Sequence, residues 1–284
     1  MKEQINYVKL DSRQGQLMTL ELLKNFDEMC KAIDVHYTLA GGTLLGALRH
    51  EGFIPWDDDA DVFLTRPDYD KFLAAYSDNI EGKEHLQLIS TRHGAPFIPF
   101  ARLVDNRTHI NQKRVSSITK LWIDILPLDE VPEEKRLKKI AFWRMVRLCL
   151  NAQPGSGKGF KKKFLRTVGS FVGKITLIRK MVCCHIDNIC KVKSKEETGL
   201  WCELVAQAAI KGCIHEDTFN DTSLVCFENN YFEMIPDYDF YLKGQYGNYM
   251  EMPTARQRRT HAVDLFIDYD ELTDREKELI GVEV

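Results

Sequence analysis

The feature that most constrains this chain is a group of four aspartates, Asp57, Asp58, Asp59 and Asp61, within five positions. Polar and apolar residues alternate from Asp59 to Thr65, which predicts a strand, and residues two apart on a strand point to the same face. Asp59 and Asp61 are therefore expected side by side, where two carboxylates repel unless a cation lies between them. Mg²⁺ suits such a pair, because it binds one or two carboxylates together with phosphate oxygens.

Two further segments are expected to complete this metal site. Gly41 and Gly42 form a turn that leads into a helix predicted over Thr43 to His50. Backbone N–H groups at such a helix start hold phosphate. Asp124 stands alone between isoleucines in a predicted strand, where a buried carboxylate is costly without a partner. A metal shared with the aspartate cluster would be that partner.

Other interpretations of the aspartates stay open. Asp57, Asp59 and Asp61 match the first half of a calcium-binding EF-hand loop, but Val62 and Asp68 stand where Gly and Glu are required. A calcium-stabilised binding protein is therefore one alternative. A metal-dependent glycosyltransferase that uses a nucleotide sugar is another, although here one predicted strand precedes the cluster instead of a longer nucleotide-binding region. The run around Gly155 does not make a phosphate-binding P-loop, because Ala152 and Gly159 occupy two required positions.

Hydrophobic periodicity predicts an α+β fold, with a mixed sheet flanked by helices in the first half and a helical second half. The predicted helices span residues 11–34, 43–50, 67–77, 133–151, 164–192 and 197–210, and the predicted strands span 36–40, 59–65, 86–90, 97–104 and 121–126.

Composition excludes several classes of protein. The 284 residues carry a net charge of −3, so the chain as a whole is not a nucleic-acid binder. We expect no secretory signal and no membrane span, because the first residues are polar and no run of about 18 apolar residues is free of charge. The eight cysteines lack C-x-x-C or zinc-type spacing and indicate free thiols in a reducing cytoplasm.

The stretch from Lys158 to Lys195 is strongly basic, with eleven Lys or Arg and one acidic residue, Asp187. Apolar residues recur at helical spacing within it. This pattern favours an amphipathic helix that contacts an anionic membrane surface. The alternative is a helix that packs its apolar face on the core and leaves a solvated basic rim.

Three blocks in order along the chain resemble the LicD family of phosphotransferases, which includes fukutin-related proteins and has a nucleotidyltransferase fold. The blocks are Gly42-Thr-Leu-Leu-Gly-Ala-Leu-Arg-His50 with Gly52-Phe-Ile-Pro-Trp-Asp-Asp-Asp-Ala-Asp61, then Trp122-Ile-Asp-Ile-Leu-Pro-Leu-Asp129, then Tyr246-Gly-Asn-Tyr-Met250 with Pro253, Arg258 and His261. Ala60 and Thr254 depart from the family pattern, but neither is a proposed ligand.

The resemblance implies a function for each matching position. Asp59, Asp61 and Asp124 would hold Mg²⁺, with Mn²⁺ as an alternative, and would carry catalysis. Asp57 would add a further ligand. Donor phosphates would be held by Gly41, Gly42 and Thr43, and Arg49 would reach a phosphate, whereas His50 is expected to be structural. Arg258 and His261 would close over the donor, unless residues 256–259 are simply a solvated basic segment. Trp56 and Trp122 are rival candidates for cation–π contact with a quaternary ammonium.

The family also implies the reaction. Its members typically use CDP-choline or another CDP-linked donor and attach phosphocholine or a similar group to a glycan or teichoic-acid precursor. We therefore expect a saccharide or lipid-linked glycan acceptor, and a cytoplasmic protein that is peripheral at the inner face of the cell membrane. The expected division is a nucleotidyltransferase-like catalytic core over residues 1–130, a helical and partly basic region over 131–225, and a C-terminal segment over 226–284 that completes the active site.

Overall fold

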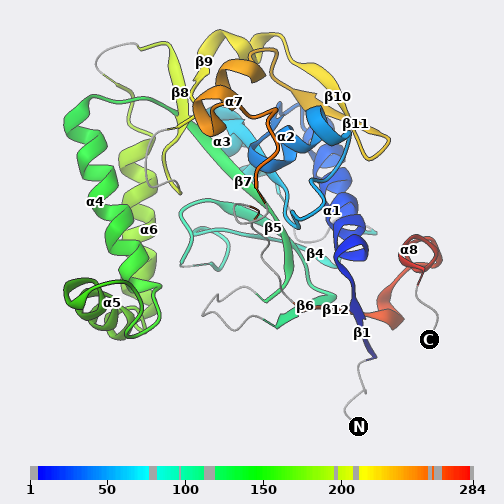
Figure 1. Ribbon diagram of the computed structural model, residues 1–284, viewed down its shortest axis with the longest axis horizontal. Coiled ribbons are helices and arrows are strands. Elements are labelled where there is room, and N and C mark those ends of the chain that lie inside the picture. The colour runs from blue at the N-terminus through cyan, green and yellow to red at the C-terminus, as the bar shows by residue number, and fades with distance from the viewer. Residues whose placement is uncertain are drawn as a thin grey trace.

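The computed structural model describes residues 6–76, 82–95, 97–111, 119–194, 198–206, 211–254, 258 and 264–281. Helices and a mixed sheet are combined in one structure, which confirms the predicted α+β class. Figure 1 shows the sheet at the centre, with a separate group of helices, α4 to α6, on one side of it. The division into three segments that the sequence predicted stays a prediction.

The central sheet has seven strands within the described residues, and its long strand β7 pairs with three others. Strand β7 is parallel to β3 and antiparallel to β5 and β8. The strands are β2 (Thr38–Leu39), β3 (Asp61–Thr65), β7 (Leu121–Glu130), β5 (Ala101–Asp105) and β4 (Leu86–Ile89) in spatial order, with β8 (Leu200–Glu203) and β9 (Ile214–His215) beside the second half of β7.

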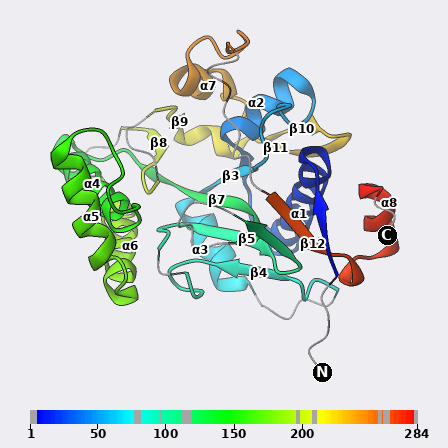
Figure 2. The same ribbon diagram turned by 60° about the horizontal axis from the view of Figure 1, so that its bottom comes forward.

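The helices fall into three groups. Helices α1 (Ser12–Ala32) and α3 (Arg66–Ala75) pack against the central strands, and α2 (Gly41–His50) enters directly from β2. Helices α4 (Glu134–Leu150), α5 (Phe160–Val172) and α6 (Thr176–Cys190) form the group beside the sheet, as both views show (Figures 1 and 2). Helix α7 (Tyr238–Tyr246) lies near α2, and α8 (Asp274–Ile280) packs on α1.

Two smaller β structures complete the described fold. Strand β12 (Asp264–Asp268) lies between β1 (Tyr7–Leu10) and β6 (Thr108–Asn111), so the two ends of the chain meet in one three-stranded sheet. Strands β10 (Ser223–Phe227) and β11 (Asn230–Met234) form a hairpin. Short 3₁₀ helices span Glu216–Asn220 and Tyr269–Glu271.

Helix α1 illustrates how local sequence determines an element. The Asp11 side chain accepts a hydrogen bond from the backbone N–H of Gln14 at 2.8 Å, and the Gln14 side chain accepts one from the backbone N–H of Asp11 at 2.8 Å. This reciprocal capping box satisfies two backbone donors that a helix start otherwise leaves free. Leu23, Phe26 and Cys30 then fall on the buried face. The helix predicted over 11–34 is confirmed, with bounds of Ser12–Ala32.

Two predicted helices are wrong in the second half of the chain. The helix predicted over 164–192 is broken into α5 and α6, and Gly173 at the break lies so close to the Leu150 carbonyl oxygen that a Cβ there would be 2.0 Å from it. Within the helix predicted over 197–210, Leu200–Glu203 forms a strand instead, because these residues pair with the second half of β7. Residues 197 and 207–210 of that prediction lie outside the described residues. Long-range pairing overrides local propensity in this segment.

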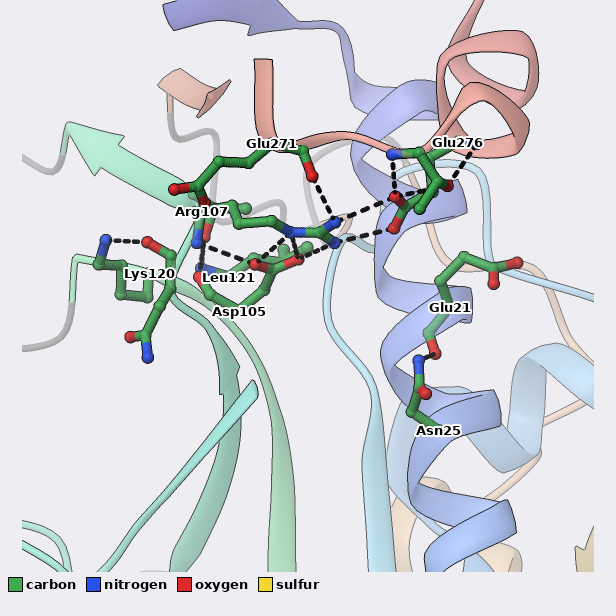
Figure 3. Close-up of polar contacts among 11 residues, drawn as sticks. Glu21, Asn25, Asp105, Arg107, Lys120, Leu121, Glu271 and Glu276 are labelled. Carbon is green, nitrogen blue, oxygen red and sulfur yellow. Dashed lines mark hydrogen bonds and ion pairs between the residues drawn. The ribbon is translucent and has the colours of Figure 1, made fainter. Parts of the chain in front are cut away.

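A buried charge cluster ties the C-terminal helix to the sheet (Figure 3). Arg107 is 4% exposed and binds Asp105, which is 2% exposed, at 2.7 Å. The same guanidinium binds both carboxylate oxygens of Glu276 in α8, at 2.8 and 3.0 Å. Glu276 also accepts a hydrogen bond from the Thr273 backbone N–H at 2.9 Å. Burial opposes ionisation of Glu276, but these donors outweigh it and lower the pKa of its carboxyl.

We predict that Glu276→Gln lowers the free energy of unfolding by about 2 kcal/mol at neutral pH, because a charge-assisted pair is lost. The folded-state pKa of Glu276 is depressed, so its contribution is full above the unfolded pKa of about 4.3 and is lost as pH falls through the folded value. Chemical denaturation across pH should therefore show the two proteins converging in acid. The exposed neighbour Glu278→Gln is the control, and a pH-independent difference would contradict the assignment.

Candidate active site

The centre of the site is a row of charged residues across three adjacent strands. Parallel pairing of β3 with β7 sets Asp61 opposite Asp124, and antiparallel pairing of β7 with β5 sets Asp124 opposite Arg102. Residues paired across strands point to the same face of a sheet. Asp61, Asp124 and Arg102 therefore form one row. The predicted convergence of Asp61 and Asp124, which lie far apart in sequence, is what the sheet register produces.

The predicted strand around the aspartates begins later than expected. Strand β3 starts at Asp61, so Asp59 lies in the preceding loop and its position does not follow from strand alternation. That loop is held by a hydrogen bond from the Asp57 backbone N–H to the Ile54 carbonyl at 2.8 Å, and by the Gln16 side chain, which donates to the Asp57 carbonyl at 2.7 Å. The loop, not the strand, determines how Asp57 and Asp59 approach Asp61.

Asp61 is under electrostatic stress from the neighbouring carboxylates. Asp61 is partly buried, and burial raises the pKa of its carboxyl well above the ordinary value. The neighbouring carboxylates of Asp59, Asp124 and Asp57 raise it further, in that order, whereas Arg102 opposes them. Buried like charges of this kind are stabilised by a cation or by protonation. The electrostatics therefore favour a positive ligand beside Asp61.

Asp124 already has a cationic partner in the protein. The Nε–H of Arg102 donates to Oδ1 of Asp124, and a second nitrogen of the guanidinium lies 3.2 Å from Oδ2 of Asp124. The guanidinium also stacks on the ring of Trp122, 4.4 Å from its centroid. A metal was the expected partner of Asp124, and Arg102 was not predicted. An arginine within an otherwise apolar predicted strand, 97–104, was the available signal.

The start of helix α2 forms a narrow cradle next to these carboxylates. Gly41 has a φ of +53°, a left-handed conformation that glycine adopts without strain. A Cβ at Gly41 would lie 2.8 Å from Oδ2 of Asp61, and a Cβ at Gly42 would lie 2.2 Å from Oδ2 of Asp57. Both glycines are thus required by the close approach of carboxylates to the helix start.

Some hydrogen-bonding groups at the start of α2 already have partners within the protein, and others do not. The Gly41 backbone N–H donates to the Tyr241 hydroxyl at 2.9 Å, and the Thr43 hydroxyl accepts from the Asp61 backbone N–H at 2.9 Å. Helix α2 has no side-chain cap. Among the described residues, the backbone N–H groups of Gly42 and Thr43 have no hydrogen-bond acceptor. Two adjacent free N–H groups at a helix start favour anion binding.

A cavity of about 320 Å³ opens beside the cradle. Gly42, Arg49, Trp56 and Asp57 line one side of it. The other side is formed by the C-terminal block, namely Tyr246, Asn248, Tyr249, Glu251 and Pro253. Arg49 joins the two sides, because its guanidinium donates to the Tyr249 carbonyl at 2.8 Å. Segments some two hundred residues apart therefore share one pocket next to the aspartates.

The two candidate tryptophans have different environments. Trp56 lines the cavity, and the guanidinium of Arg258 lies 4.4 Å from its ring centroid. Trp122 is not among the cavity residues, and its ring faces Arg102. A cationic group already stacks on each ring, but the Trp56 ring is the one that borders the pocket. His261, predicted to act with Arg258, lies outside the described residues.

The chemistry of the donor set suits a hard divalent cation. Asp57, Asp59, Asp61 and Asp124 offer carboxylate oxygens, which Mg²⁺ and Mn²⁺ prefer. Within the part of the chain that the structure describes, no three Asp, Glu, His or Cys side chains gather closely enough to form a ready-made metal site. The carboxylates would have to converge further around an ion.

An EF-hand calcium site does not fit the backbone. An EF-hand loop that begins at Asp57 would run to position 68, but residues from Asp61 to Thr65 form a sheet strand and α3 begins at Arg66. A strand paired on both sides, with β2 and with β7, does not wrap around an ion.

Known proteins are similar to this chain over the segments that form the site. Residues 34–144 match the family model described as LicD/FKTN/FKRP, nucleotidyltransferase domain. The chain is 25% identical over 269 residues to the lipopolysaccharide cholinephosphotransferase LicD of Haemophilus influenzae, covering 90% of this chain and 97% of that protein. Uncharacterised proteins of Rickettsia prowazekii and Rickettsia typhi match shorter segments, at 35% identity over 66 residues and 39% over 57 residues, about a fifth of this chain. Residues 34–144 are thus similar to the nucleotidyltransferase domain of the LicD family.

Proposed function

We propose that this protein transfers phosphocholine from CDP-choline to a hydroxyl group of a glycan acceptor and releases CMP. The observation that carries the proposal is the placement of Asp61 and Asp124 on paired strands, beside a helix start where the N–H groups of Gly42 and Thr43 have no acceptor among the described residues. The similarity to a cholinephosphotransferase along nearly the whole of both chains supports the choice of transferred group. Other CDP-linked donors belong to the same chemical class.

The acceptor and the place of the reaction belong to the same proposal. The acceptor is a saccharide in a lipopolysaccharide or teichoic-acid precursor, which supplies the attacking hydroxyl. The reaction takes place at the inner face of the cell membrane, where lipid-linked precursors are available.

The donor diphosphate would bind at the start of α2. The N–H groups of Gly42 and Thr43 supply hydrogen bonds, and Arg49 supplies a positive charge at the wall of the cavity. The carboxylate of Asp57 lies against Gly42, so a diphosphate and a carboxylate would meet at one helix end. Two such anions require a cation between them. This requirement supports Mg²⁺ or Mn²⁺ as the cofactor.

Asp59 and Asp61 would hold the metal, with Asp124 and Asp57 as further ligands. The metal, when bound, neutralises charge on the phosphoryl oxygens and on the departing phosphate. In the transfer, the acceptor oxygen forms a bond to the phosphorus distal to cytidine, and the bond from that phosphorus to the CMP oxygen breaks. The hydroxyl proton passes to a carboxylate. Asp124, which forms an ion pair with Arg102, would accept this proton.

We predict that Asp61→Asn reduces CMP release from CDP-choline by about 10³-fold, because the central carboxylate of the site is lost. Its thermal stability without metal should equal or exceed that of the wild type, since the variant buries no repelled carboxyl. An assay of CMP release with a glycan acceptor, together with thermal melts, measures both. Asp34→Asn, 92% exposed, is the control. Turnover near wild type in Asp61→Asn, or turnover of UDP-sugars in place of CDP-choline by the wild type, would contradict the proposal.

A second prediction concerns competition between Arg102 and the metal for Asp124. Removing the guanidinium in Arg102→Gln leaves the aspartate row more negative, and we predict about tenfold tighter binding of Mn²⁺. Arg102→Lys keeps the charge and should bind Mn²⁺ nearly as the wild type does. Electron paramagnetic resonance titration of free Mn²⁺ measures the affinity without any turnover. Unchanged or weaker Mn²⁺ binding by Arg102→Gln would contradict a metal site that includes Asp124.

A third prediction separates the two tryptophans. A choline headgroup in the cavity would take the position of the Arg258 guanidinium over Trp56. We predict that Trp56→Leu weakens CDP-choline binding about fivefold and leaves binding of CDP, which lacks the ammonium group, unchanged. Trp122→Leu should leave both affinities unchanged because its ring faces Arg102. Calorimetry with both ligands measures these affinities. If Trp122→Leu weakened CDP-choline binding and Trp56→Leu did not, the choline headgroup would bind at Trp122 instead.

A further inference from the structure

Helix α5 turns its small residues toward the protein and its large apolar residues toward solvent. A Cβ at Gly169 would lie 2.6 Å from the Cys149 carbonyl oxygen, so α5 packs backbone to backbone on the end of α4. Ser170, on the same side, is 9% exposed. Helices on the surface of a soluble protein normally bury their apolar stripe against the core. In α5 this orientation is reversed.

The outward face of α5 is formed by aromatic and aliphatic side chains. Phe160, Phe164 and Phe171 are 84, 59 and 58% exposed and lie on one side of the helix, with the first two rings stacked at 6.4 Å. The exposed apolar surface, here called the α5 face, comprises Phe160, Phe164, Leu165, Val168, Phe171 and Val172, and Ile175 and Leu177 continue it into α6. Contiguous exposed apolar surface of this kind marks a binding face.

The charge around the α5 face is of one sign. Residues 135–186 contain fourteen Lys or Arg and no Asp or Glu, although the whole chain carries a net charge of −3. Lys161, Lys162 and Lys163 lie in the first turn of α5. The Lys174 amine lies 5.0 Å from the centroid of the Phe171 ring, at the edge of the apolar surface. Long cationic side chains around an apolar stripe are typical of a helix at a lipid–water interface.

We infer that the α5 face binds an anionic phospholipid surface, with α5 lying in the plane of the membrane. The apolar side chains would enter the acyl boundary, and the flanking lysines would contact lipid phosphates. Docking of two copies through this face would bring two sets of positive charge together with no acidic residue in the segment to offset them. Within the described residues, no helix is both long and apolar enough to cross a bilayer. The inferred attachment therefore lies on the membrane surface.

In the proposed function, the α5 face would hold the protein at the membrane where the reaction takes place. Vesicle binding requires neither nucleotide nor metal, so it can be measured separately from the transfer reaction. The test is sedimentation of the full chain with vesicles of phosphatidylcholine alone or mixed with phosphatidylglycerol. We expect the wild type to bind the anionic vesicles at least about tenfold more strongly than the neutral ones, and to be released by high salt.

Variants of exposed residues test the face without disturbing the core. Phe164→Gln combined with Phe171→Gln should weaken anionic-vesicle binding about tenfold or more, because the buried apolar area is lost. Leu224→Gln, at 62% exposure on β10, is the matched control and should bind as the wild type does. The double variant should keep its circular dichroism and its turnover of CDP-choline with a soluble acceptor, so that failure of the membrane inference is separate from failure of the proposed chemistry.

Two results would overturn the inference. One is equal recovery of the wild type in the supernatant with neutral and anionic vesicles. The other is a wild-type dimer in light scattering that the double variant converts to a monomer, which would assign the α5 face to a second copy of this chain.

Discussion

The parallel pairing of β3 with β7 is the constraint on which the site depends. It places Asp61 opposite Asp124, although more than sixty residues of chain separate them, and the next pairing places Arg102 in the same row. The register leaves no freedom, because a slip by one residue would turn these side chains to the buried face that Val62 and Ile123 occupy. The charged row is thus a consequence of how the core strands pack.

The structure holds this row in an electrostatic balance. Asp61 is opposed by three carboxylates, whereas Asp124 is offset by Arg102. The helix start at Gly41 and Gly42 adds partial positive charge, and it lies so close to Asp57 and Asp61 that no larger residue fits. The C-terminal block then closes the cavity through Tyr249. The proposed diphosphate and its cation would bind where several carboxylates lie close together and where Arg102 and the start of α2 partly neutralise their charge.

Local signals in the sequence predicted much of this arrangement, and long-range contacts account for what they missed. The helix that follows Asp11, the glycine turn at Gly41 and the strand that ends at Thr65 depend on neighbouring residues and were predicted close to their observed bounds. The adjacency of Asp61 and Asp124 followed from the chemistry of a lone buried aspartate. Arg102 was missed because its partner is on another strand, and so was Tyr241, whose hydroxyl holds Gly41 from two hundred residues away. The break at Gly173 depends on contact with α4, which periodicity does not report.

The most direct test of the central claim is the anomalous diffraction of Mn²⁺ in crystals soaked with CDP-choline. We expect a manganese peak within coordination distance of Asp59 and Asp61, next to Asp124, with the donor diphosphate between the ion and the N–H groups of Gly42 and Thr43. A peak elsewhere, or a bound donor in another cavity with the Arg102–Asp124 pair and the α2 start untouched, would contradict it.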